Sequence, residues 1–286
     1  MHFVKSKSIL SKSNGMNLFR GCSHGCIYCD SRSNVYNMNH KFEDIEVKEN
    51  SIILLKKELI KRNASMIGIG SMSDPYIPLE KSLEYVRKTL QLIYRHGFGF
   101  TCITKSDLIL RDLDLLKKIN EKSKVVVQMT LTTADDDLCR ILEPNVSPTS
   151  KRVEVLKILN ENNIPTVVWL CPILPYINDT KENINSIIDF CIDCNVKGII
   201  CFKMGLTLRS GNREYFYMKL DEYFPNLKEK YIKEFGDKYI ITSSNNDELM
   251  SIFKKRTIDE GILNNNEEIF KYLSDFPIKS FQSKLI

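Results

Sequence analysis

The chain has 286 residues, enough for one α/β barrel with a small extension. Lysine and arginine exceed aspartate and glutamate by 41 to 36, which permits a polyanionic partner without requiring one. No apolar run approaches the ~20 residues that cross a bilayer, and the first residues lack the apolar core of a secretory signal. We therefore expect a cytoplasmic protein with no membrane partner.

Short apolar runs alternate with amphipathic stretches along most of the chain. We expect strands at residues 16–21, 66–70, 99–104, 124–131, 166–171 and 196–202. Between them we expect helices at residues 51–61, 79–95, 110–120, 149–160 and 180–193, with Thr180 as an N-cap of the last. About six β/α repeats predict an α/β fold, a partial (β/α)6 TIM-type barrel of parallel strands over residues 1–210.

Beyond residue 210 the pattern changes to helices separated by Gly, Asn and Pro, at residues 212–221, 227–235, 247–260 and 267–275. We expect residues 211–286 to form a helical C-terminal extension packed on the barrel. Chemistry in such barrels lies on the loops after the C-terminal strand ends. The expected strand ends are also rich in Gly, Cys and polar residues, which supports both the fold and the site.

Nine cysteines are the most informative part of the composition. An odd number without a secretory signal argues against a disulfide framework. Clustered cysteines in a reducing compartment are typically metal ligands, whereas isolated ones are typically small buried hydrophobes. Cys191, Cys194 and Cys201 could hold a second cluster, but packing between helix and sheet is the favoured interpretation. Cys102 and Cys139 are expected in the core.

The first expected strand ends in a C-x3-C-x2-C spacing, Arg20-Gly-Cys-Ser-His-Gly-Cys-Ile-Tyr-Cys-Asp30. Thiolates are soft ligands that suit iron–sulfur clusters, and three of them leave one iron of a [4Fe–4S] cluster open. Gly21 and Gly25 let the backbone turn tightly around an inorganic core. A zinc site with His24 as fourth ligand is an alternative, although no second ligand pair follows. A purely electron-carrying cluster would need a fourth cysteine.

This loop resembles the signature of the radical SAM superfamily, C-x3-C-x-aromatic-C at the end of a first barrel strand. The resemblance implies that Cys22, Cys26 and Cys29 hold a [4Fe–4S] cluster, whose open iron chelates S-adenosylmethionine (SAM). It also implies that the reduced cluster cleaves SAM to methionine and a 5′-deoxyadenosyl radical, which abstracts hydrogen from the substrate. Tyr28 would lie beside the adenine.

Four further segments are similar to the spore photoproduct lyase-like group, over about residues 8–210. They are Gly70-Ser-Met-Ser-Asp-Pro-Tyr-Ile-Pro-Leu-Glu80, Ile103-Thr-Lys105, the strand end at Thr130 and Leu142-Glu-Pro-Asn145. The similarity implies that Ser73 and Asp74 hold the methionine amino group of SAM. It implies that Lys105 meets the SAM carboxylate and that Thr130 contacts the ribose.

Each of these residues also has a structural interpretation. Ser73 and Asp74 suit a turn or a helix N-cap, Lys105 a solvated surface, and Thr130 a strand interior. Their regular placement at strand ends beside the cysteine loop favours the functional interpretation.

The chain departs from the lyase pattern at Ser71, where the lyases carry a hydrogen-donating cysteine. A serine O–H bond is too strong to give hydrogen to a carbon radical, so thymine-dimer repair is disfavoured. Tyr76 and Cys171 are the alternative hydrogen donors at expected strand ends, although Cys171 would equally suit a buried position.

The substrate stays unidentified, with DNA or another nucleic acid as one candidate. Phosphate could bind a basic rim, for which a merely solvated surface is the alternative: Arg20, Arg32, Lys105, Lys203, Arg209 and Arg213. The enzyme would need an electron donor such as flavodoxin or ferredoxin. Competing functions are radical SAM modification of a peptide, protein or RNA, and a non-catalytic Fe–S or zinc protein that binds nucleic acid.

Overall fold

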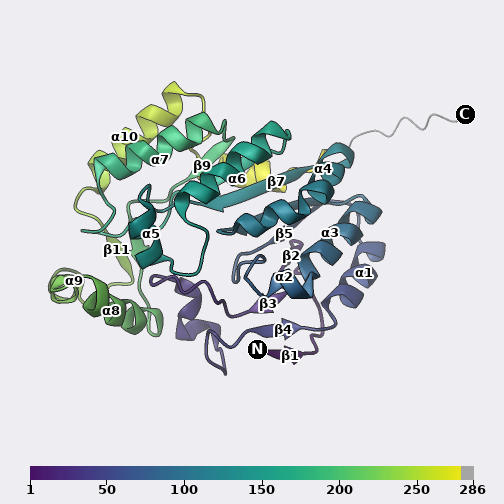
Figure 1. The fold of residues 1–286 in the computed structure, drawn as a ribbon, viewed down its shortest axis with the longest axis horizontal. Helices are drawn as coiled ribbons and strands as arrows, with labels where there is room; N and C mark the ends of the chain where they lie inside the picture. The colour runs from purple at the N-terminus through teal and green to yellow at the C-terminus, as the bar shows by residue number, and fades with distance from the viewer. Residues whose placement is uncertain (278–286) are drawn as a thin grey trace, which may run out of the picture.

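The computed structural model describes residues 1–277 (Figure 1). Its main sheet has six parallel strands in the order β2-β5-β6-β7-β8-β9. They are β2 (Gly15–Met16), β5 (Met66–Ile69), β6 (Gly99–Thr104), β7 (Val125–Thr130), β8 (Thr166–Trp169) and β9 (Gly198–Ile200). Within the described residues β2 does not pair with β9, so the sheet is an open, partial barrel of the predicted α/β class.

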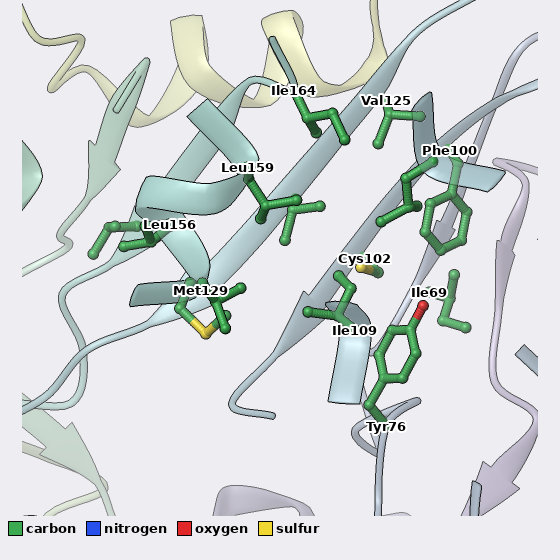
Figure 2. Close-up of a cluster of buried hydrophobic side chains, with 14 of the residues drawn as sticks. Ile69, Tyr76, Phe100, Cys102, Ile109, Val125, Met129, Leu156, Leu159 and Ile164 are labelled. Atoms are coloured by element: carbon green, nitrogen blue, oxygen red, sulfur yellow. The ribbon is translucent and has the colours of Figure 1, made fainter. Parts of the chain in front are cut away.

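Helices lie between successive strands, and most of them cover the outer face of the sheet (Figure 1). They are α1 (Ser51–Lys61), α2 (Glu80–Leu83), α3 (Tyr85–His96), α4 (Leu113–Lys122), α5 (Asp136–Leu142), α6 (Thr149–Glu161) and α7 (Lys181–Asp193). Figure 2 shows part of the resulting core, with Leu156 and Leu159 of α6 beside Met129 of β7. Thr180 caps α7 as predicted, because its hydroxyl accepts a hydrogen bond from Asn183 N.

Two predicted elements are broken in the structure. The predicted strand at residues 16–21 becomes β2 and β3 (Phe19–Arg20), and β3 pairs with β4 (Glu46–Lys48) in a separate sheet. The third strand of that sheet is β1 (His2–Val4). The predicted helix at residues 79–95 is interrupted at Glu84, which adopts a left-handed φ of 54°. Apolar periodicity continues across both breaks and therefore does not reveal them.

The chain after β9 contains the predicted helices and one sheet that was not predicted. The helices are α8 (Asn212–Tyr223), α9 (Leu227–Phe235), α10 (Asn246–Asp259) and α11 (Asn266–Ser274). The sheet pairs β10 (Gly205–Thr207) antiparallel with β11 (Ile240–Thr242). Residues 278–286 of the predicted extension lie outside the described residues, and the domain division at residue 210 stays a prediction.

The last helix, α11, packs on the inner face of the barrel. Side chains along a strand alternate between faces, so Val126 lies on the same face as Thr130, and Val167 on the same face as Trp169. Thr130 and Trp169 line the cavity described below. Val126 and Val167 form an apolar cluster with Ile200, Ile269 and Leu273. The helix therefore fills the inside of the barrel below that cavity. No helix among residues 1–277 is long and apolar enough to span a membrane.

Candidate functional site

A cavity of about 300 Å³ opens at the C-terminal ends of the main-sheet strands. Three of its wall residues are Cys22, Cys26 and Cys29, from the loop that follows β3. The other predicted site residues on its wall are Ser73, Asp74, Lys105, Thr130 and Cys171. The structure therefore brings together in one cavity all of the predicted site residues except Tyr28 and Tyr76.

The spacing of the cysteine sulfurs does not fit a single zinc ion. Two thiolates on one zinc ion at about 2.3 Å can lie at most about 4.6 Å apart. Among residues 1–277, the one group of three His, Cys, Asp or Glu ligand atoms all within 4.8 Å of one another is His2, His40 and Asp44. The three sulfurs, with or without His24, are therefore spread more widely than one zinc ion requires.

The thiols of Cys22 and Cys26 are buried, and that of Cys29 is half-buried. Burial raises the pKa of Cys22 to about 12, and the carboxylate of Asp74 raises it further. Burial also raises the pKa of Cys26 well above its usual value, although Lys105 acts in the opposite direction. A bound metal centre would supply the positive charge that thiolates need here, and its binding would release protons.

The segment 142–145 fastens the cysteine loop to the barrel. Ile27 N donates to the carbonyl of Leu142 at 3.0 Å, and Asn145 Nδ2 donates to the carbonyl of Ser23 at 2.9 Å. Gly25 has a φ of +74°, and a Cβ there would lie 3.0 Å from Pro144. These contacts with the Leu-Glu-Pro-Asn motif thus hold the cysteine loop in its conformation.

Behind this segment lies an ion pair between Glu143 and Arg152, whose side chains are both 0% exposed. Glu143 also accepts a hydrogen bond from the hydroxyl of Tyr28, the residue that precedes Cys29. Burial favours a neutral Glu143, but Arg152, Lys105 and Tyr28 outweigh it and lower the pKa of this carboxyl. Arg152 Nη1 in turn donates to the carbonyl of Thr130 at 2.8 Å.

The sequence interpretation missed the Glu143–Arg152 pair. One signal was available, because Arg152 falls on the buried face of α6 together with Thr149, Val153, Val155, Leu156 and Leu159. A charged residue in such a row has to find a buried partner.

Asp74 joins three segments around the cavity. Its Oδ1 accepts hydrogen bonds from Tyr76 N and from Thr104 Oγ1, each at 2.8 Å. Its Oδ2 accepts one from Lys105 N at 2.8 Å and lies 3.0 Å from His24 Nε2. Burial raises the pKa of Asp74, but His24 and the N–H donors prevail and lower it.

Ser73 is also held internally, because its hydroxyl donates to the carbonyl of Gly21 at 2.6 Å. Ser73 and Asp74 therefore tie the cysteine loop to the ends of β5 and β6. Their predicted contacts with SAM stay predictions, as does the contact of Thr130.

Lys105 differs from these residues. Its ammonium has no hydrogen-bond or salt-bridge partner within residues 1–277, and it lies 5.7 Å from the ring centre of Tyr28. Burial alone would lower the pKa of Lys105, but Cys26 and Glu143 outweigh it and raise the pKa. The site thus holds a protonated amine that faces the cavity without an anion of its own.

The two predicted hydrogen donors have different surroundings. Cys171 lines this cavity and also a second one of about 530 Å³, which Tyr28 lines as well. Tyr76 lines neither, because its side chain is fully buried and its hydroxyl lies 3.3 Å from Asp112 Oδ2. Figure 2 shows it in the main core beside Ile69.

Most of the predicted basic rim is paired within the protein. Arg32 lies 2.6 Å from Glu43 Oε1 and packs over the ring of Tyr215 at 3.8 Å. Arg209 contacts Asp30 at 3.5 Å, and Arg213 binds Asp237 at 3.0 Å. Arg20 donates to the carbonyls of Tyr36 and Asn37. Within residues 1–277 only Lys105 and Lys203 of this set have ammonium groups without a partner.

Cys191, Cys194 and Cys201 lie among buried side chains of the main core, where they pack as small apolar residues. Cys191 and Cys194 are fully buried in the main core, and Cys201 Sγ lies 3.7 Å from Met250 Sδ. Cys102 and Cys139 are also buried, as predicted.

Comparison with known proteins places the chain in a family. It belongs to the radical SAM superfamily, whose model matches residues 16–191 and so includes the cysteine loop. The family implies a [4Fe–4S] cluster and SAM as cofactors.

Two relatives are described as uncharacterized. A protein of Methanocaldococcus jannaschii is 34% identical over 168 residues, 58% of this chain and 62% of its own length. The chain thus spans less than two thirds of that relative. A protein of Acidianus two-tailed virus is 29% identical over 224 residues, 72% of this chain and 71% of its own length.

Among solved structures, the fold resembles spore photoproduct lyase. A lyase variant with dinucleoside spore photoproduct has a TM-score of 0.63 and 13% sequence identity, over 86% of this chain and 74% of that chain. A doubly substituted lyase variant with bound SAM and the same dinucleoside gives a TM-score of 0.61, over 87% of this chain and 74% of that chain. At this identity the likeness establishes a shared fold.

Proposed function

We propose that the chain is a radical SAM enzyme that reductively cleaves SAM at a [4Fe–4S] cluster. The observation that carries this proposal is the meeting of Cys22, Cys26 and Cys29 with the unpaired Lys105 in one cavity. The wide spacing of the sulfurs supports a cluster over a zinc ion. When bound, the cluster and SAM supply a 5′-deoxyadenosyl radical for hydrogen abstraction.

The cavity residues have distinct proposed roles around these cofactors. The three cysteines hold the cluster, and Lys105 binds the carboxylate of SAM, since its ammonium lacks a partner among residues 1–277. Ser73 and Asp74 meet the amino group and also keep the loop in place. Tyr28 and Thr130 bound the space for the nucleoside.

Cys171 is our candidate hydrogen donor in place of the lyase cysteine. It lines both cavities, and burial raises its pKa to about 12, so that it carries S–H at neutral pH. Donation of its hydrogen atom to a carbon-centred product radical leaves a thiyl radical. One electron from the donor protein and one proton restore the thiol.

The substrate and the reductant belong to this proposal as well. A nucleic acid is one candidate substrate, supported by fold likeness to a lyase, but the internal pairing of Arg32, Arg209 and Arg213 weakens the case for a phosphate-binding rim. Peptide, protein or RNA modification is the alternative. Flavodoxin or ferredoxin would supply the electron.

Anaerobic reconstitution with iron and sulfide, followed by dithionite and SAM, tests the function. We expect release of 5′-deoxyadenosine and loss of both iron and product in Cys26→Ala. Cys194→Ala is the matched control, because this buried thiol lies in the main core away from the cavity. An intact four-iron cluster that releases no 5′-deoxyadenosine would refute enzymatic SAM cleavage, and full iron content in Cys26→Ala would remove the loop from the site.

A further inference from the structure

Two histidines and a carboxylate meet at the edge of the three-stranded sheet of β1, β4 and β3. His2 lies on β1, opposite Glu46 of the neighbouring strand β4 (Figure 1). His40 and Asp44 belong to the turn before β4, where Asp44 N donates to the carbonyl of Lys41 at 2.9 Å. One ring nitrogen of each histidine and one oxygen of Asp44 lie within 4.8 Å of one another. Nitrogen and oxygen ligands of one zinc ion lie up to about 4.2 Å apart, so small side-chain movements let these three share an ion.

The ring of His40 is oriented so that one nitrogen can act as a ligand. Its Nδ1 lies 3.0 Å from the carbonyl of Lys41, which can only accept, so Nδ1 carries the hydrogen of the neutral imidazole. Nε2 then keeps a lone pair. This atom is buried and has no hydrogen-bond partner within residues 1–277. Histidines that bind metals usually donate their second ring N–H to a carbonyl or carboxylate in the same way.

Two carboxylates lie beside the two imidazole rings. Glu46 Oε2 is 3.6 Å from His40 Nε2, which is too far for a hydrogen bond. Asp44 Oδ2 lies 3.0 Å from His2 Nδ1, and its Oδ1 lies 3.0 Å from the amino group of Met1. The side chains of His2 and Asp44 are partly exposed, so an ion can reach them from solvent. A divalent cation at this point would pair with both the lone pair of His40 and the negative charge around it.

We propose that His2, His40 and Asp44 bind one zinc ion, with Glu46 as a second carboxylate that balances its charge. Imidazole nitrogen together with carboxylate oxygen suits zinc, whereas magnesium and calcium prefer oxygen ligands alone. None of these residues lines either of the two cavities described above. The inference goes beyond the proposed function and does not depend on SAM cleavage.

The position of the site in the sheet gives the ion a structural role. Strand β1 is at the edge of the sheet and pairs only with β4 within the described residues. An ion held by His2, His40 and Asp44 joins this edge strand to the turn before β4. On its other side β4 pairs with β3, where Arg20 lies opposite Glu46. The ion would thus fasten the sheet from which the cysteine loop emerges.

Calorimetric titration of zinc into the full chain tests the proposal, with the reconstituted cluster occupying the cysteines and oxygen excluded. We expect one zinc ion per chain to bind at micromolar concentration. His40→Gln and Asp44→Asn should each weaken binding at least about tenfold. The matched control is His96→Gln, because His96 ends α3 and lies outside the group of ligands. No zinc binding at micromolar concentration, equal binding to wild type and His40→Gln, or displacement of zinc by millimolar magnesium overturns the proposal.

A second readout separates this site from the cysteine loop and from the proposed function. A variant with alanine at Cys22, Cys26 and Cys29 should still bind one cobalt ion, a spectroscopic substitute for zinc. Its absorption spectrum should show nitrogen and oxygen ligands without a thiolate charge-transfer band, and His40→Gln in that background should abolish it. Failure of this variant to bind cobalt would place the metal on the cysteines and overturn the proposal. SAM cleavage by wild type without zinc binding refutes this site alone, whereas zinc binding without SAM cleavage refutes the proposed function alone.

Discussion

Replacement of Glu143 by glutamine should destabilise the protein far more than a single surface change. The change removes the carboxylate that pairs with Arg152, and both side chains are 0% exposed. Loss of one partner from a buried ion pair costs roughly 3–5 kcal/mol, because the remaining charge is left without compensation. A chain of 286 residues unfolds with an entropy of about 0.6 kcal/mol/K, so the Tm should fall by about 5–8 °C.

Thermal unfolding of Glu143→Gln, followed by circular dichroism, measures this effect. The control is Asp137→Asn, which breaks the exposed ion pair with Arg140, where the side chains are 93% and 59% exposed. That control should leave the Tm within experimental error. In a double variant with methionine at both Glu143 and Arg152, most of the loss should be recovered, since no buried charge remains.

A fall of less than about 2 °C in Glu143→Gln would refute this reasoning, because the buried charge would then have found another partner. A double variant less stable than Glu143→Gln would also contradict it. Reconstituted Glu143→Gln should bind less iron than wild type, since the Tyr28 hydroxyl loses its charged acceptor beside the cysteine loop. Iron content equal to that of wild type would show that the loop does not depend on this contact.

Three further predictions concern acid stability and the cavity. Glu143 has a lowered pKa, so its contribution to the free energy of unfolding is complete above pH ~4.3 and is lost as the pH falls through the folded-state pKa. On acidification the free energy of unfolding of wild type should therefore fall more steeply with pH than that of Glu143→Gln. Equal slopes of the two curves would contradict this. Lys105→Met should raise the KM for SAM at least about tenfold by removing the unpaired ammonium, and an unchanged KM measured by 5′-deoxyadenosine release would exclude that contact. Cys171→Ser should leave 5′-deoxyadenosine release intact while abolishing hydrogen return to the product, which mass spectrometry detects as altered products; an unchanged product profile would exclude Cys171 as the donor.

The alternation of strands and helices was predictable because each element buries one apolar face. Helix Ser51–Lys61 and strand Gly99–Thr104 have the predicted bounds, and the family match confirms the class of protein. The broken elements were not predictable in this way. The split of β2 from β3 depends on which neighbouring strand each half pairs with, and those partners lie far along the chain.

The cavity was predictable to a similar degree. Strand ends of a parallel barrel meet at one edge, so residues such as Ser73 and Lys105 could be placed together from their order in the sequence alone. Partners that depend on side-chain direction could not be placed. Tyr76 follows a strand end but turns into the core toward Asp112, and Arg209 turns toward Asp30 instead of solvent.

The position of α11 inside the barrel has a consequence for how the protein is made. The cysteine loop leaves the ribosome more than 230 residues before Phe270, whose ring centre lies 6.3 Å from that of Phe202 on the wall of the second cavity. At about 5–20 residues per second, synthesis separates the two by roughly ten seconds or more. The inward cluster of Val126, Val167 and Ile269 cannot form before α11 is made. The interior of the barrel is therefore completed only after synthesis has passed α11.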